Sequence, residues 1–264
     1  MKNLAIFISY LLPVSIREKI LTLFSLTLGK GFDFQSLNKE INLFKNLIKN
    51  ENNLFLDIGA NKGEYTDILI KEFPTSEVYA FEPQKNLFNI LKNKYLKNNN
   101  IKLFNVAVSN ERRKKELNVR FAGDALGSLY KRKFLKNKLT KTEIVKCERL
   151  DQILDNNQIV DFAKIDTEGN EMNVLKGIGN LIYNFKIIQV EFGGTWIDSR
   201  FFYRDLYEFF IDKNFSLYRM SPNKLIKIDQ YNEKDEYFTF ANFIAINNKK
   251  IFTTIKSKDK VKTN

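Results

Sequence analysis

Two acidic residues with glycines between them carry the strongest chemical signal in the sequence. Asp57 ends an apolar run and opens the segment 57–63, Asp-Ile-Gly-Ala-Asn-Lys-Gly, and Glu82 ends the next apolar run. Glycines there let a ligand approach the backbone closely, while a carboxylate would repel a diphosphate. The acid suits a ligand with ammonium and sulfonium groups, and an acid at the second strand end can accept hydrogen bonds from ribose hydroxyls. This pattern predicts S-adenosylmethionine as the ligand.

A second set of acids follows two later apolar runs. Asp166 ends the run 160–165, Glu168 follows it closely, and Glu191 lies near the end of the run 187–192. Because parallel strands end at the same edge of a sheet, we expect these side chains near the ligand. A carboxylate there can take the proton of a hydroxyl group, with Asp166 the first choice as base or orienting group and Glu191 the second. The alternative is that the three acids hold a divalent cation; we predict no metal.

Histidine is absent and cysteine occurs once, as Cys147. These counts exclude an imidazole base, a Ser-His-Asp triad, an intramolecular disulfide and a zinc site built on several cysteines. Proton transfer therefore falls to Asp, Glu, Lys, Tyr or Cys. The motif that accompanies methylation of exocyclic amino groups, Asn/Asp-Pro-Pro-Tyr, is also missing after residue 165.

These acids need a scaffold that brings strand ends together. From residue 52 onward, strand-like and helix-like runs alternate, which is typical of a parallel sheet flanked by helices. The expected strands are 53–58, 77–81, 101–108, 160–165, 187–192, 215–218 and 240–246, and the expected helices are 64–72, 87–96, 171–176 and 203–211. Two short strands, 117–121 and 143–147, would flank an added loop in which 123–128 forms either a lid or a plain flexible loop. After Glu191, Gly193 and Gly194 leave room for a substrate, and Trp196 is either a stacking surface or a core side chain.

At this point the sequence resembles the FkbM family of methyltransferases. The matching stretches are 55–63, 78–83, 105–109, 150–151 and 164–171. The resemblance implies a Rossmann-like class I methyltransferase fold with a seven-stranded, mostly parallel sheet, S-adenosyl-L-methionine as cofactor, and usually transfer to a hydroxyl. It also implies a cofactor site made of Asp57, Gly59, Ala60, Asn61, Gly63, Glu82, Pro83, Asn105 and Ala107.

The rest of the chain suggests three parts: an N-terminal helical extension at 1–50, the methyltransferase domain at 51–250 and a basic tail at 251–264. The apolar stretches 4–12 and 20–28 indicate one or two amphipathic helices. We expect them to pack against the domain, the alternative being that they lie on a membrane surface. The net charge is +12, which we interpret as a solvated lysine-rich surface rather than a nucleic-acid site.

The sequence thus predicts an O-methyltransferase that acts on a hydroxyl, on a sugar of a bacterial surface polysaccharide or its lipid- or nucleotide-linked precursor. The substrate could carry phosphate, DNA is not expected as a partner, and the expected location is cytoplasmic or peripheral at the inner face of the membrane. Two alternatives stay open: an RNA methyltransferase, and a catalytically silent relative that binds the cofactor or a protein.

Overall fold

The computed structural model describes residues 2–33, 36–48, 52–132 and 141–250. The expected basic tail lies outside these residues, as does part of the added loop. The helices are α1 (Lys2–Leu11), α2 (Val14–Thr27), α3 (Leu37–Asn42), α4 (Glu64–Glu72), α5 (Lys85–Lys94), α6 (Glu171–Ile178), α7 (Thr195–Ser199) and α8 (Tyr203–Asp212). The strands are β1 (Leu54–Ile58), β2 (Glu77–Phe81), β3 (Ile101–Phe104), β4 (Ala107–Val108), β5 (Arg113–Val119), β6 (Lys141–Glu148), β7 (Val160–Ile165), β8 (Phe185–Phe192), β9 (Phe215–Met220), β10 (Leu225–Ile228) and β11 (Ala241–Asn247). Short 3-10 turns, such as Lys45–Leu47 and Gly179–Asn184, join some of them.

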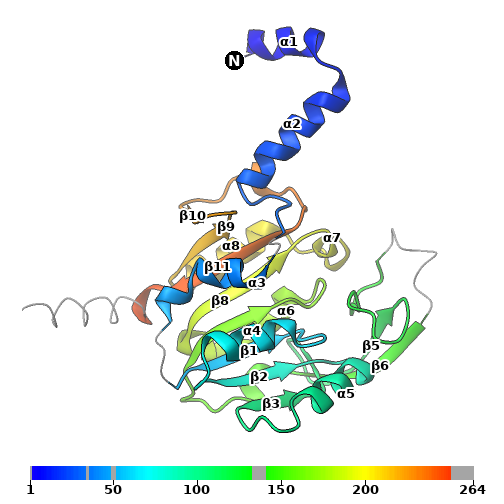
Figure 1. The fold of residues 1–264 in the computed structure, drawn as a ribbon, viewed down its shortest axis with the longest axis vertical. Coiled ribbons are helices and arrows are strands. Elements are labelled where there is room, and N and C mark those ends of the chain that lie inside the picture. The colour runs from blue at the N-terminus through cyan, green and yellow to red at the C-terminus, as the bar shows by residue number, and fades with distance from the viewer. Residues whose placement is uncertain (1, 34–35, 49–51, 133–140, 251–264) are drawn as a thin grey trace, which may run out of the picture.

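The central sheet has the order β10-β9-β11-β8-β7-β1-β2-β3 (Figure 1). The pairs from β8 through β7, β1 and β2 to β3 are parallel, while β11 pairs antiparallel with β8 and β9. This topology confirms the predicted α/β class with a mostly parallel sheet. Over the described residues, however, the sheet has eight strands and not seven, because β10 turns back along β9 as a hairpin.

The expected third strand, 101–108, is wrong in its second half. β3 ends at Phe104, and Ala107–Val108 leaves the central sheet to pair with β6 in a second sheet of order β4-β6-β5. The two short strands expected around the added loop are longer than predicted and pair antiparallel over seven positions, from Arg113 to Val119. We call residues 113–132 and 141–148 the β5–β6 lobe; in Figure 1 it stands at one side of the central sheet.

Helices cover both faces of the sheet because the side chains of each strand alternate between them. In β1, Leu54, Leu56 and Ile58 pack in one cluster with residues of α6 and α8. Phe55 points to the other face, where it packs with residues of α3 and α4. All five residues of β1 are buried, as expected of a central strand in a parallel sheet. Asp57 lies on the face of Phe55, so its side chain is directed towards α4.

The two N-terminal helices do not pack against the domain as expected. No described residue of α2 is buried, and in Figure 1 the pair α1–α2 extends away from the body. We call residues 2–28 the N-terminal arm. The expected packing is wrong because the body already closes its core without the arm: Ile41 and Phe44, farther along the chain, fill that face of the sheet. Across the described part of the chain, no helix is long and apolar enough to span a bilayer.

Candidate functional site

A cavity of about 480 Å³ opens where β1, β2 and β7 end. Its walls come from the loops after these strands, from the β5–β6 lobe and from α3 through Leu37. A ligand at this position would lie at the carboxyl ends of parallel strands, which is the usual site in open α/β sheets.

The loop after β1 forms the floor of this cavity. The main-chain N–H groups of Gly59 and Ala60 both donate to Phe81 O at 3.0 Å, so the loop is bound to the end of β2. Gly59 has φ +90°, and a Cβ on it would lie 1.8 Å from Asp166 O. The position therefore requires glycine, and its close approach brings the β1 loop against the end of β7.

Glu82 joins the two loops that hold the cavity. Its Oε2 accepts from Asn61 N at 2.9 Å and its Oε1 accepts from Gln84 N at 2.7 Å. Each carboxylate oxygen can accept a second hydrogen bond, so both remain able to receive ribose hydroxyls. Burial raises the pKa of Glu82 to about 7, although the two main-chain donors favour the ionised form.

Asp57 is completely buried and its carboxylate is only partly satisfied. Oδ2 accepts from Thr66 Oγ1 at 2.6 Å, while Oδ1 has no hydrogen-bond partner. Burial raises the pKa of Asp57, an effect that Lys164 opposes. An unpaired buried acceptor normally costs stability, so its presence at the cavity wall fits a ligand that brings a positive charge or a donor. S-adenosylmethionine brings both, and the residues present fit it.

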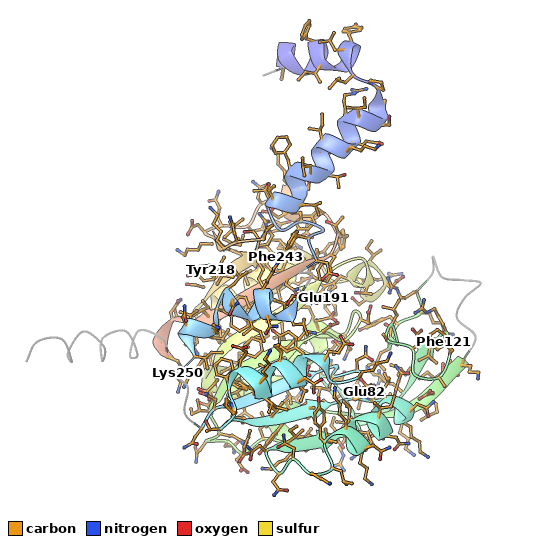
Figure 2. All side chains as sticks on the ribbon, in the orientation of Figure 1. Glu82, Phe121, Glu191, Tyr218, Phe243 and Lys250 are labelled. Carbon is orange, nitrogen blue, oxygen red and sulfur yellow. The ribbon has the colours of Figure 1, made fainter. Side chains whose placement is uncertain are left out.

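The acids expected on the acceptor side lie around one lysine. Lys164 Nζ donates to Asp166 Oδ2 at 2.6 Å, and the ring of Tyr65 lies 5.1 Å from Nζ. Burial by itself lowers the pKa of Lys164. The negative charges of Asp166, Asp57 and Glu191 outweigh this effect, so the pKa of Lys164 is raised. Burial and then the charge of Asp166 raise the pKa of Glu191 well above its ordinary value. Figure 2 shows Glu82 and Glu191 on the side of the sheet towards Phe121 of the lobe.

Glu168 and Glu171 connect the end of β7 to the lobe and to α6. Glu168 O accepts from Ser128 Oγ at 2.6 Å, and its Oε2 lies 3.4 Å from Arg132 NH1. Burial, together with the charge of Asp166, raises the pKa of Glu168 to about 8. Glu171 Oε1 accepts from the N–H groups of Thr167 and Gly169, which makes it a loop-holding residue. Burial raises its pKa to about 7.

The structure places the predicted site residues in two groups. Those that line the cavity are Asp57, Gly59, Ala60, Asn61, Glu82, Pro83, Ala107, Asp166 and Glu168. Gly63, Asn105 and Glu191 do not. Gly63 caps the start of α4 with φ +79°, and Asn105 donates to the carbonyls of Glu82 and Pro83. Glu191 is the next-to-last residue of β8, the strand that pairs with β7. Within the described residues, no group of three or more His, Cys, Asp or Glu side chains has the geometry of a metal site.

Sequence reasoning missed two wall residues that matter, Lys164 and Gln84. Lys164 lies two positions before Asp166, a spacing that puts both side chains on one face of a strand, so this one could have been found. Gln84 Nε2 donates to Asp124 O at 2.6 Å, which holds the lobe against the cavity and has no local signal. Leu126 and Gly127, within the segment 123–128 that the sequence singled out, are part of the cavity wall. Trp196 is a core residue, 1% exposed and packed on Phe192.

Comparison with known proteins identifies the family of the chain. Residues 57–217 match the model of the Methyltransferase FkbM domain, and no protein with a curated description matches the sequence. Among solved structures, an rRNA methylase from Streptococcus thermophilus aligns with 12% identity and a TM-score of 0.45, over 82% of this chain and 98% of that one. TrmK from M. capricolum, in complex with S-adenosyl-homocysteine, aligns with 12% identity and a TM-score of 0.44, over 83% and 70%. A SAM-dependent O-methyltransferase from Thermotoga maritima aligns with 11% identity and a TM-score of 0.41, over 81% and 66%. With the family model covering more than half of its residues, the chain belongs to the FkbM family of methyltransferases, and S-adenosylmethionine is its methyl donor.

Proposed function

We propose that this methyltransferase acts on oxygen, transferring the methyl group to a sugar hydroxyl of a bacterial surface polysaccharide or of its lipid- or nucleotide-linked precursor. The observation that supports it most is the pair Asp166 and Glu191 at adjacent strand ends beside the cofactor cavity, with the pKa of Glu191 raised well above its ordinary value. An alcohol is a poor nucleophile until its proton leaves. A carboxylate with a raised pKa accepts that proton more readily than an ordinary one.

When bound, S-adenosylmethionine supplies an activated methyl group on a positively charged sulfur. Glu82 holds the ribose hydroxyls through the free lone pairs of its two oxygens, and Asp57 offers its unpaired Oδ1 to the positively charged part of the ligand. Asn61 Oδ1, which also has no partner in the protein, gives a further acceptor. These residues fix the position of the reacting group, which is the main requirement of an in-line transfer.

The acceptor hydroxyl is oriented by Asp166 and deprotonated by Glu191. Asp166 is paired with the ammonium of Lys164 through one carboxylate oxygen, and a carboxylate has further lone pairs that can accept a hydrogen bond from the hydroxyl. The carboxylate of Glu191, whose pKa is raised, has no such ion-pair partner among the described residues. The residue is half-buried, so it can pass the proton on to water. Gly193 and Gly194, which follow it, present little bulk to the acceptor.

Cofactor binding is tested first, by calorimetry with S-adenosylmethionine and S-adenosylhomocysteine. Asp57→Asn and Glu82→Gln should each weaken cofactor binding by about tenfold or more, because each variant loses one charged hydrogen bond to the cofactor. Asp161→Asn, a buried aspartate at the other end of β7, and Glu77→Gln, at the start of β2, should leave it unchanged. Equal binding by wild type and both site variants would contradict the assigned cofactor residues.

Transfer is tested with a labelled methyl group and three acceptor classes: lipid-linked sugars, nucleotide-linked sugars and RNA. Glu191→Gln and Asp166→Asn should lower turnover by about 100-fold or more with little change in cofactor affinity, while Glu208→Gln on α8 should be neutral. Methylation of RNA alone would replace the sugar assignment. Cofactor binding without transfer to any hydroxyl would point to a catalytically silent protein.

A further inference from the structure

The N-terminal arm exposes an unusual amount of apolar surface. Phe7 and Tyr10 of α1 are 60% and 85% exposed, and Leu21 and Phe24 of α2 are 68% and 64% exposed. The other large apolar side chains exposed on the arm are Ile8, Leu11, Val14, Ile16, Ile20, Leu23 and Leu28. Exposed apolar side chains in this number on one short segment indicate an interaction site.

The helices of the arm do not resemble surface helices that stand free in water. α1 carries a single charged residue, Lys2. Isolated helices of 10 and 14 residues are marginal in water, so each needs a surface that covers its exposed apolar side chains. At 1.5 Å per residue, each is shorter than the roughly 30 Å hydrocarbon core of a bilayer. They can therefore lie in an interface but not cross it.

The arm is attached firmly at its base. Arg219 of β9 donates from Nε to Leu28 O at 2.7 Å, and its NH1 lies 3.2 Å from Asp235. The same aspartate pairs with Lys30 at 3.0 Å. Gly29 has φ +76°, and a Cβ there would lie 1.9 Å from Met220 O. The arm thus leaves the body at a fixed point on the β9–β11 side of the sheet.

That fixed point is close to the acceptor side of the site. Gly31 N donates to Phe240 O at 2.6 Å, and Phe240 directly precedes β11. In β11, Asn242 is the register partner of Glu191, and a Cβ on Gly193 would lie 3.6 Å from the Cα of Phe240. An external surface to which the arm binds would therefore also face the end of β8.

We infer that the N-terminal arm docks the enzyme on an anionic lipid bilayer, and that the acceptor hydroxyl belongs to a lipid-linked substrate presented there. The arm carries three basic side chains, Lys2, Arg17 and Lys19, against the single acidic Glu18, and the whole chain has a net charge of +12. This charge complements an anionic leaflet. A bilayer surface can also cover the exposed apolar side chains of both helices at once. The inference rests on the proposed function and selects the lipid-linked precursor among its substrates.

The test is flotation of the full-length protein with vesicles of phosphatidylcholine, with and without phosphatidylglycerol. Wild type should float with the anionic vesicles, less with the neutral ones and less at high salt. The fourfold variant Phe7→Ser, Tyr10→Ser, Leu21→Ser and Phe24→Ser should bind at least about tenfold more weakly, because burial of each such side chain contributes substantially. The control is the double variant Leu96→Ser and Ile144→Ser, two exposed apolar residues on the body, which should float like wild type.

Two results would overturn the inference: a wild type that stays with the soluble fraction, or a fourfold variant that floats as well as wild type. Dimers seen by light scattering without vesicles, and lost in the fourfold variant, would assign the arm to a second copy of the chain. Calorimetry with S-adenosylhomocysteine on the same preparations separates the two proposals. Cofactor binding without flotation removes the docking arm and leaves the proposed function. Flotation without cofactor binding removes the proposed function and, with it, the lipid-linked acceptor, but leaves the docking arm.

Discussion

At the cofactor site, both oxygens of Glu82 already accept main-chain hydrogen bonds, from Asn61 and from Gln84. The same carboxylate is 4% exposed, and its pKa is about 7. The group is thus half protonated near neutral pH. Two hydroxyl donors of a ribose would favour the ionised form, so ligand binding and loss of this proton are linked.

We therefore expect cofactor affinity to fall as the pH is lowered. Between pH 8 and pH 6 Glu82 becomes mostly protonated, and the affinity for S-adenosylhomocysteine should fall by roughly tenfold. Calorimetry in buffers of different ionisation enthalpy should show proton release on binding at pH 7. In Glu82→Gln both the pH dependence and the proton release should be reduced. An affinity that rises towards pH 6 would contradict this role.

Lys164 opposes the rise in the pKa of Glu191, the proposed base. It is the neighbour that favours the ionised form of Glu191. Lys164→Gln should move the acidic limb of the pH–rate profile to higher pH by about one unit or more, with a fall in turnover at pH 7. Lys186→Gln, which removes another lysine–aspartate pair of the sheet, is the matched control. An unchanged profile in Lys164→Gln would show that the lysine acts only on stability.

Single residues of the site were predictable where local spacing determines them. Asp57, Glu82 and Asp166 each follow an apolar run, and parallel strands bring such positions to one edge. Gln84 could not be predicted, because it holds the cavity wall through a contact with Asp124, which lies far from it in the sequence. Glu191 was predicted near the cavity and lies beside it, one strand farther from β1 than Asp166.

At the scale of elements, the helix 64–72 and the strands 77–81 and 160–165 agree with the structure to the residue. The boundaries of these elements are marked by neighbouring Gly, Pro or charged residues, which made them predictable from the sequence. The prediction of one strand over 101–108 was wrong because no local signal marks where the chain leaves one sheet for the other. Val106 and Ala107 are apolar, as Leu103 is. The strand β10 was not predicted for a similar reason. It is an edge strand with partly exposed residues, so its sequence lacks a clear alternation of apolar and polar residues.

The β5–β6 lobe closes the cavity, and its position can be tested through one glycine. A Cβ on Gly127 would lie 2.6 Å from Gln84 Nε2, the donor that holds the lobe through Asp124 O. Gly127→Ala should weaken cofactor binding by roughly threefold to tenfold, about 1 kcal/mol, mainly through faster dissociation in stopped-flow measurements. Gly194→Ala, whose Cβ would meet nothing closer than 3.8 Å, should bind normally. Slower dissociation in Gly127→Ala would contradict a closing lobe.

For the whole molecule, three buried acids make stability depend on pH. The pKa values of Glu82, Glu168 and Glu171 are about 7, 8 and 7, all raised from 4.5. From about pH 5 to pH 8 the folded chain keeps protons that the unfolded chain has lost, so the free energy of unfolding must fall as the pH rises. We expect a fall of several kcal/mol without cofactor, measured by urea unfolding. The slope should be shallower in Glu171→Gln; greater stability at pH 8 than at pH 5 would exclude this account.

The arm should contribute little to the stability of the body. α2 has no buried residue, so a chain lacking residues 1–24 exposes no core. Its free energy of unfolding should stay within about 1 kcal/mol of wild type, and its cofactor affinity should be unchanged. A loss of several kcal/mol would show that the arm is part of the core.

The residues of the cavity wall are grouped in one stretch of the chain, which bears on how the acceptor preference of this enzyme can change in evolution. Among the described residues, all that line the cavity lie between Asp57 and Asn170, apart from Leu37. The end of β8, the segment that follows it and the arm all lie outside that stretch. With the acceptor bound at the end of β8 as proposed, changes in those regions alter which acceptor is chosen while the donor site is inherited intact. Exchange of the arm and of residues 193–240 between relatives should then transfer acceptor preference with them.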